Sequence, residues 1–378
     1  MIVLETVPAD FMDLPRQIND YPELKRLSAH SIIATQHYTT FPASAESFAS
    51  IILGVYPPRN YYQSCLVNKQ ELKNLPGLLS EARTNNYRSA LYLPYMAGVP
   101  LDKRLQEFAG FDKVYATSSN PDYKKNAETH FLEPGVFLAD DLAFSELLSD
   151  IEENIEKKNS YLSIFLPQSG HAPFPNRPPS MSIADYGHQL TVNQLKWLSK
   201  LTKLLKAKNT LDKTTIIITG DHGIRTGKED PKFIPGLIDE YSFKVPLFIF
   251  AENLIPEPQT ITGPTSHIDL LPTLIDMHGW QSDLEFQGLP IRKAAQSNRR
   301  LFFFADWYFS ADGFMDDGKF YMTSHILERT LENDSMKFDL ELSKMSPNDS
   351  LRVVETISDM KQLSFDWIEK VICTYGNS

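Results

Sequence analysis

The sequence is poor in cysteine. It has two cysteines in 378 residues, Cys65 and Cys373, and they stand in none of the close pairs that typify zinc sites. We expect free thiols without a functional role, with a single disulfide between them as the alternative. The scarcity excludes a disulfide-stabilised scaffold and a cysteine-ligated metal centre.

Long hydrophobic runs and an excess of positive charge are also lacking. No stretch approaches the roughly 18 consecutive apolar residues of a membrane span, and no signal peptide is recognisable. Acidic residues outnumber basic ones by 48 to 37, which gives a formal net charge of -11. This balance argues against a nucleic-acid partner and against simple electrostatic docking on anionic lipid.

The first residues already resemble the second half of a buried strand, over 2–4. A core strand usually has a lead-in, so we expect the chain to continue upstream in a longer protein. A membrane anchor or export signal would then lie outside these residues. The lack of a targeting segment is therefore weak evidence for the cytoplasm.

Apolar strand-like runs alternate with helical patterns along most of the chain. Strands are predicted at 2–4, 89–93, 161–166, 214–219 and 245–250, and helices at 22–27, 47–53, 75–85, 140–157, 184–206 and 268–277. This alternation predicts an α/β fold with a mostly parallel sheet and helices on both faces. After about residue 296, short strands at 301–304, 319–323 and 336–340 and a helix at 351–371 predict a smaller α+β subdomain packed on the main sheet. We therefore expect two domains, 1–295 and 296–378.

One strand ends on an unusual pair. The β-branched run at 214–219 leads through Gly220 into Asp221 and His222, followed by Gly223. In open α/β sheets, ligands bind at the carboxyl ends of the strands. A carboxylate and an imidazole together suit a divalent metal ion. The alternative is an ordinary strand end with an aspartate turn.

Three further polar residues stand near predicted strand or helix ends. Glu5 follows the first strand, Ser44 precedes a helix, and His171 follows the strand at 161–166. A serine at a helix start is usually an N-cap, but it can also be a nucleophile favoured by the helix dipole. A single histidine before a proline-rich loop is more often structural than catalytic. These alternatives stay open on the residues alone.

Taken together and in order, these segments resemble the sulfatase-like branch of the alkaline phosphatase superfamily. The matching segments are 2–6 with its strand-end acid, 22–27 (P-E-L-K-R-L), 44–59 with its G-V-Y-P-P-R ending, 108–112 with a G-F-D turn, 171–174 (H-A-P-F), 220–223 (G-D-H-G), 244–247 (K-V-P-L) and 266–274 with its D-x-x-P-T-L helix. Each segment is weak alone, whereas their order covers essentially the whole chain. The resemblance implies an alkaline-phosphatase-like fold and a metal-dependent hydrolase or transferase, with 1–295 as the catalytic domain.

The departures from that pattern bear on the chemistry. Arylsulfatases carry C-x-P-S-R at the nucleophile, where the cysteine becomes formylglycine; that position falls on Ser44, followed by A-E-S-F. Formylglycine is therefore not expected. A single Glu5 also stands where arylsulfatases have paired aspartates. A lone glutamate with a hydroxyl nucleophile resembles lipoteichoic-acid synthases and phosphoethanolamine transferases, although their nucleophile is usually threonine.

The resemblance implies one divalent ion, with Mn²⁺ favoured and Zn²⁺, Mg²⁺ or Ca²⁺ as alternatives. The implied metal ligands are Glu5, Ser44, Asp221 and His222; the catalytic residues are Ser44 and His171; and the residues binding the anionic substrate are His171, Arg225 and Lys228. Thr40 is the backup nucleophile. His267 and Asp269 are candidate ligands for a second metal, but Asp269 suits a helix cap at least as well, so one metal is favoured.

The expected activity is a phospho-group transferase or phosphodiesterase that acts through a phosphoserine on an envelope lipid or glycan. A sulfatase or phosphomonoester hydrolase is the first alternative, and an inactive scaffold on the same fold is the second. The expected substrate is an anionic ester, such as a phospholipid head group or a glycan. The expected location is extracytoplasmic, with membrane attachment only through segments outside this chain.

Overall fold

The computed structural model describes residues 1–57, 76–94, 110–117, 138–171, 177–224, 235–336, 340 and 343–375. Among the predicted functional residues, Arg225 and Lys228 lie outside these ranges, as does Cys65.

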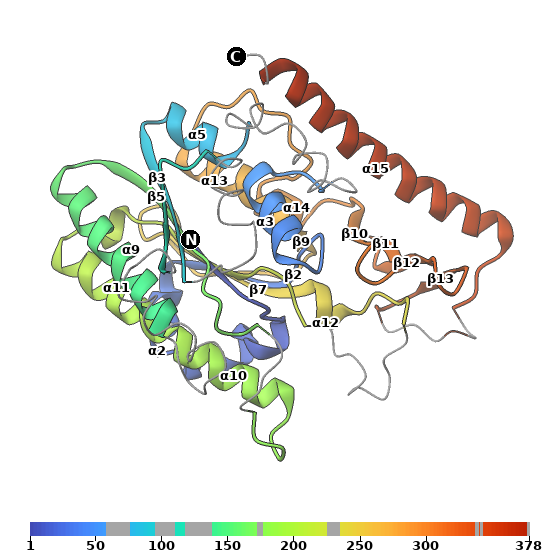
Figure 1. Cartoon of the computed structure of the whole chain (residues 1–378), viewed down its shortest axis with the longest axis horizontal. Coiled ribbons are helices and arrows are strands. Elements are labelled where there is room, and N and C mark those ends of the chain that lie inside the picture. The colour runs from blue at the N-terminus through green and yellow to red at the C-terminus, as the bar shows by residue number, and fades with distance from the viewer. Residues whose placement is uncertain are drawn as a thin grey trace. The chain divides into compact units, whose positions relative to one another are not determined.

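A nine-stranded, mostly parallel sheet forms the larger layer of the fold (Figure 1). Its strands are β1 (Ile2–Leu4), β2 (Ser31–Tyr38), β3 (Tyr87–Leu93), β4 (Lys113–Ala116), β5 (Ser160–Phe165), β6 (Ile216–Gly220), β7 (Lys244–Phe250), β8 (Gln259–Ile261) and β9 (Thr265–Ser266). The order is β4-β3-β5-β1-β6-β7-β2-β8, and β9 pairs with β2. The β6–β7 pair is antiparallel, whereas β1 pairs in parallel with both β5 and β6. The predicted α/β fold is confirmed.

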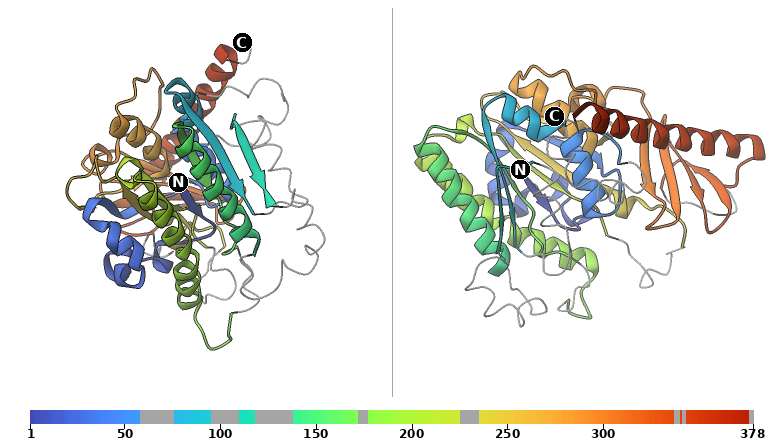
Figure 2. Two further views of the ribbon diagram at one scale, coloured as in Figure 1. Left: turned by 90° about the vertical axis from the view of Figure 1, so that its left-hand side faces the viewer. Right: turned by 45° about the horizontal axis from the view of Figure 1, so that its top comes forward.

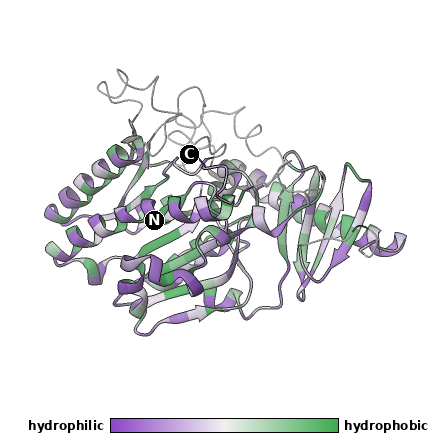
Figure 3. Ribbon diagram, turned by 90° about the horizontal axis from the view of Figure 1, so that it is seen from below, coloured by the Kyte–Doolittle hydropathy of each residue, from purple (hydrophilic) through white to green (hydrophobic). Residues whose placement is uncertain are grey.

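The central strands are buried on both faces. All three residues of β1 are buried, as are all five of β6 and the last six of β7. Figure 3 shows strands of the large sheet mostly in the colour of apolar residues, while the helices carry both colours. Continuous burial without alternation is what a covered parallel sheet requires. It also explains why these strands were recognisable from the sequence.

Helices flank the sheet. They include α2 (Pro22–Leu27), α3 (Ser44–Leu53), α5 (Leu78–Thr84), α9 (Leu138–Glu156), α10 (Ile183–Gln194), α11 (Lys196–Ala207) and α13 (Leu270–His278). The long helix predicted over 184–206 is two helices, and Leu195 is both the C-cap residue of α10 and the N-cap residue of α11. Strand β2 was not predicted. Its burial alternates only partly, and no turn signal isolates it from α2.

A separate four-stranded antiparallel sheet follows near the C-terminus (Figure 2, right). It consists of β10 (Leu301–Ala305), β11 (Ala311–Asp316), β12 (Lys319–Ser324) and β13 (Arg329–Asn333), and α15 (Pro347–Tyr375) packs on it. The predicted strand at 336–340 is wrong at Met336 and Leu340, which lie in a bend and a turn; 337–339 lie outside the described residues. Strands β11 and β13 were not predicted.

By its internal contacts the chain divides into two compact units. The first comprises 1–35, 79–221 and 246–261, and the second comprises 36–78, 222–245 and 262–378. These units do not follow chain order, so the boundary between 295 and 296 stays a prediction. The described residues contain no helix that is both long enough and apolar enough to cross a membrane.

Candidate metal centre and nucleophile

Two carboxylates stand at the ends of neighbouring parallel strands in the first unit. The register of β1 on β6 pairs Leu4 with Gly220. Glu5 and Asp221 are the next residues of the two strands, and the Asp221 amide donates to the Leu4 carbonyl at 2.9 Å. Because the strands are parallel, both carboxylates are brought to the same edge of the sheet. The predicted convergence of strand ends follows directly from this pairing.

Thr6 orients both carboxylates. Its amide donates to Asp221 Oδ1 at 2.8 Å, and its hydroxyl donates to Glu5 Oε1 at 2.6 Å. Its φ of 53° is unusual for a β-branched residue and costs roughly 1–3 kcal/mol. The strained backbone turns the amide and the hydroxyl toward the two acids. Thr6 was not among the predicted site residues, since nothing in its neighbours signals a left-handed conformation.

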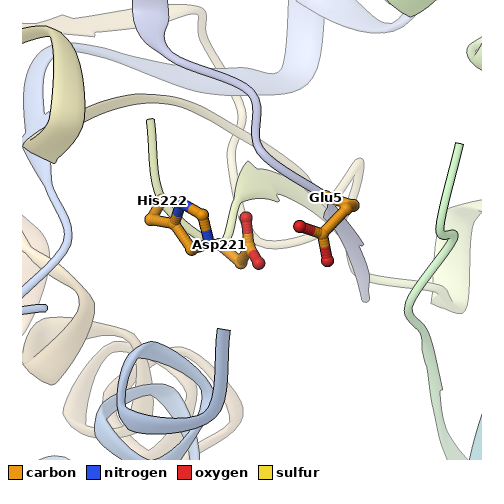
Figure 4. A group of neighbouring side chains, drawn as sticks. All are labelled: Glu5, Asp221 and His222. Atoms are coloured by element: carbon orange, nitrogen blue, oxygen red, sulfur yellow. The ribbon is translucent and has the colours of Figure 1, made fainter. Parts of the chain in front are cut away.

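His222 completes a three-residue cluster with these acids. One ligand atom from each of Glu5, Asp221 and His222 lies within 4.8 Å of the others, and among the described residues no other such group of three is found. Figure 4 shows the two carboxylates turned toward each other, with the imidazole beside Asp221. The three residues have the donor types expected for a divalent metal site.

The His222 ring is held in one tautomer. Its Nδ1 lies 2.6 Å from the Gly223 carbonyl, which can only accept, so Nδ1 carries the proton and Nε2 keeps its lone pair. This is the backbone hydrogen bond that typically orients a metal-binding histidine. Gly223 itself is required sterically, because a Cβ there would lie 1.8 Å from the Tyr241 carbonyl oxygen.

Ser44 lies beside that lone pair, within the second unit. Its Oγ is 3.3 Å from His222 Nε2. The structure makes Ser44 the first residue of α3, whereas Ala43 is the N-cap residue and makes no side-chain cap bond. The capping role is thus not assigned to Ser44. At the first turn, its oxygen lies near the positive end of the helix dipole, which favours a developing negative charge.

A second carboxyl group occupies the first turn of α3. Glu46 is 7% exposed, and burial raises its pKa to about 7, with His222 opposing the rise and Asp306 adding to it. Glu46 was not among the predicted site residues. Its burial beside His222 could not be predicted, because a glutamate in a helical pattern is normally exposed.

The structure places His171 on the turn after β5, the strand that neighbours β1. Its side chain is exposed. The turn lies against the end of β1, since a Cβ on Gly170 (φ 129°) would be 2.5 Å from the Glu5 carbonyl oxygen. The backbone of His171 is therefore held near Glu5.

Asp140 holds this turn in place. It is buried, and its carboxylate accepts from the amides of Gln168 and Ser169 and from the Ser169 hydroxyl. Desolvation raises its pKa to about 6 against these hydrogen bonds, which lower it. Asp140 was predicted only as a helix residue.

Replacing Asp140 by asparagine should destabilise the fold by about 1–3 kcal/mol, because the amide NH₂ would face a donor of Ser169. The pKa of Asp140 in the folded state lies above the usual value of an aspartate. Between these two pKa values, the folded state therefore binds more protons than the unfolded state. The contribution of this carboxyl to stability therefore falls as pH rises from about 4 to about 6. Urea titrations across this range should show the gap between wild type and D140N narrowing with pH.

The matched control for D140N is Glu153→Gln, an exposed change on the same helix in a surface pair with Lys157. It should alter stability by about 0.5 kcal/mol or less. Equal effects of the two substitutions would show that Asp140 does not hold the turn.

The side chains of the backup nucleophile and of the two candidate ligands for a second metal contact other residues. Thr40 is fully buried, and its hydroxyl lies 2.6 Å from Ser50 Oγ, which makes it a poor nucleophile. Asp269 caps its helix through Ser266 and pairs with Arg299, and His267 Nδ1 lies 3.0 Å from Ser47 Oγ. These contacts fit a structural role for both residues.

The residues fit a divalent ion on two grounds. Two carboxylates this close repel each other unless a cation or a proton intervenes, and Asp221 is only 3% exposed, where a charge needs a partner. The unprotonated Nε2 of His222 and the Ser44 oxygen supply further donors of the right type. A mostly parallel α/β sheet with such strand ends defines a metal-dependent hydrolase or transferase of the alkaline phosphatase type.

Comparisons with known proteins agree with this class. Residues 1–280 match the Sulfatase family model, and the chain belongs to that family. N-acetylglucosamine-6-sulfatase of Bos taurus is 32% identical over 112 residues; the match covers 29% of this chain and 20% of that relative. The chain thus spans about a fifth of the length of the curated relative it matches.

Solved structures share the fold over nearly the whole chain. The lipoteichoic acid synthase LtaP from Listeria monocytogenes has a TM-score of 0.73 at 16% identity, covering 97% of this chain and 91% of that chain. A protein of the alkaline phosphatase superfamily from Vibrio parahaemolyticus has a TM-score of 0.69 at 18% identity, covering 100% of this chain and 87% of that one. The recognised superfamily is confirmed.

Proposed function

We propose that this Sulfatase-family protein is a metal-dependent phospho-group transferase or phosphodiesterase that acts through a phosphoserine at Ser44. The observation that supports it most is the 3.3 Å approach of the Ser44 hydroxyl to Nε2 of His222, which is one of the three candidate metal ligands. A serine without the C-x-P-S-R signal, and a single Glu5 on the first strand, favour phosphorus over sulfur.

One divalent ion would be held by Glu5, Asp221, His222 and Ser44 Oγ. When bound, it would act as a Lewis acid that lowers the pKa of the serine hydroxyl and polarises the ester. Mn²⁺ is the favoured ion, with Zn²⁺, Mg²⁺ and Ca²⁺ as alternatives.

The residues divide the reaction into two displacements. Ser44 loses its hydroxyl proton to solvent, its Oγ attacks phosphorus in line, the new P–O bond forms, and the bond to the leaving alkoxide breaks. His171 protonates that leaving oxygen or stabilises the equatorial oxygens. Water or an acceptor hydroxyl then attacks phosphorus, the P–Oγ bond breaks, and Ser44 Oγ takes up the proton that the attacking oxygen loses. Arg225 and Lys228 stay predicted clamps for the anionic group.

The substrate proposed is an anionic ester of the cell envelope, either a phospholipid head group or a glycan. The fold shared with LtaP supports a domain that works outside the cytoplasm. Attachment to a membrane would then depend on segments beyond this chain.

A sulfatase or phosphomonoester hydrolase is the second candidate, because the curated relative in hand is a sulfatase. Three substrates separate these two candidate functions: p-nitrophenyl sulfate, p-nitrophenyl phosphate and a p-nitrophenyl phosphodiester. The release of p-nitrophenol from each is measured with and without Mn²⁺. We expect the highest kcat/KM for the phosphodiester, and only with metal. Preferred turnover of the sulfate would favour the sulfatase.

The scaffold alternative is tested on the same preparation. Metal analysis and Mn²⁺ titration of the purified chain should show one ion per molecule. A chain that neither contains nor binds an ion would be a scaffold.

A further inference from the structure

An exposed aromatic pair lies on the turn between β10 and β11, in the second unit. Trp307 is 55% exposed and Tyr308 is 39% exposed. Their rings meet edge to face, with centroids 5.5 Å apart. Exposing so much of a tryptophan costs burial free energy, so an exposed tryptophan held in place merits a functional explanation.

The turn holds Trp307 firmly. The amides of Tyr308 and Phe309 both donate to the Ala305 carbonyl, at 3.1 and 2.7 Å. The Asp306 carboxylate accepts from the Trp307 amide at 2.8 Å and from Lys361 Nζ of α15 at 3.2 Å. A ring held this way loses little conformational entropy when a ligand binds.

Two contacts tie this turn to the segment that leads into Ser44. The Phe304 amide donates to the Thr40 carbonyl at 2.9 Å, and the Trp307 ring stacks on Phe41, with centroids 5.4 Å apart and planes inclined by 25°. Ser44 is three residues beyond Phe41, a span of at most about 11 Å of extended chain. The exposed pair of Trp307 and Tyr308, here called the aromatic platform, therefore lies close to the candidate nucleophile.

We propose that Trp307, with Tyr308 at its edge, stacks against a hexopyranose ring of the substrate. The inference rests on the proposed function, because the sugar would belong to the ester that Ser44 attacks. The electron-rich ring face attracts weakly positive C–H groups. Sugars of the gluco configuration present such groups as a flat face, because their hydroxyls are equatorial.

The surroundings favour a sugar over a lipid chain. Asp306, which accepts from the Trp307 amide, forms an ion pair with Lys361, and a charged pair at this turn makes a poor bed for an acyl chain. The chain also carries a net charge of -11, which opposes anionic membranes. The platform therefore selects the glycan among the proposed envelope substrates.

Two mixed diesters test this: ethyl p-nitrophenyl phosphate, and the same ester with methyl β-glucoside linked through O6 in place of ethanol. In wild type, kcat/KM should favour the sugar diester. W307A should lower that preference roughly three- to tenfold, mainly through KM, and W307F should restore part of it. Ile326→Ala, an equally exposed apolar residue (58%) on another turn of the same sheet, should leave the preference unchanged.

A binding measurement separates this inference from the proposed function. If wild type cleaves neither diester, the proposed function fails. The affinity for cellotetraose, measured by calorimetry, then shows whether Trp307 binds a sugar. A threefold or greater loss of affinity in W307A supports the platform. An unchanged preference in W307A overturns it, as does failure of wild type to bind cellotetraose, or binding of phosphatidylglycerol vesicles through Trp307 without sugar binding.

Discussion

Replacing Ser44 by alanine should lower kcat on an activated phosphodiester by roughly 10³-fold or more. The variant loses the atom that would form the covalent bond, while the helix should be retained, because the N-cap residue of α3 is Ala43 and not Ser44. Threonine at this position should retain part of the activity, since it supplies the same hydroxyl. Steady-state kinetics of both variants against wild type measure the effect.

The matched control for S44A is Ser145→Ala, which removes an exposed serine hydroxyl from α9. It should change kcat by less than about twofold, as expected for a surface substitution. Full activity of S44A in a correctly folded, metal-loaded protein would contradict a serine nucleophile.

Replacing Asp221 by asparagine should weaken Mn²⁺ binding by at least roughly 10–100-fold and abolish metal-dependent turnover. The substitution is nearly isosteric and keeps an oxygen for the Thr6 amide, so the loss reports the missing charge. Calorimetric titration of chelator-treated protein with Mn²⁺ measures the affinity directly, without relying on activity.

Stability gives an independent measure of the same site. At a metal concentration of about 100 times Kd, wild type should gain about 2.7 kcal/mol of stability. D221N should gain much less, and without metal it should be at least as stable as wild type, because one of two repelling carboxylates is gone. Asp317→Asn, an exposed change in the β11–β12 turn, is the control and should bind Mn²⁺ normally. Equal Mn²⁺ affinity of D221N and wild type would exclude Asp221 as a ligand.

The sequence was most informative where burial is continuous. Strands β1 and β6 are buried at every position, so they were predicted closely. Because they pair in parallel and in register, the convergence of Glu5 with Asp221 could also be anticipated. Strand β2 and the break at Leu195 could not, because tertiary contacts rather than local pattern decide them.

The supporting residues were beyond prediction for a different reason. Thr6 orients the two carboxylates through a left-handed backbone conformation. Asp140 binds a turn that lies 28 residues away in the sequence. The pKa of Glu46 is raised by burial. None of these properties has a local sequence signal, since each depends on which distant segment packs alongside. The candidate ligands were therefore predictable, while the residues that orient them were not.

The most direct test of the account is to trap the covalent intermediate. Wild-type protein, mixed with an activated phosphodiester and quenched within the first turnover, would be digested and analysed by mass spectrometry. We expect the peptide that contains Ser44 to carry one phospho-group, located on Ser44, and S44A to carry none. A phospho-group on another residue such as Thr40, or rapid turnover without any adduct, would contradict the account.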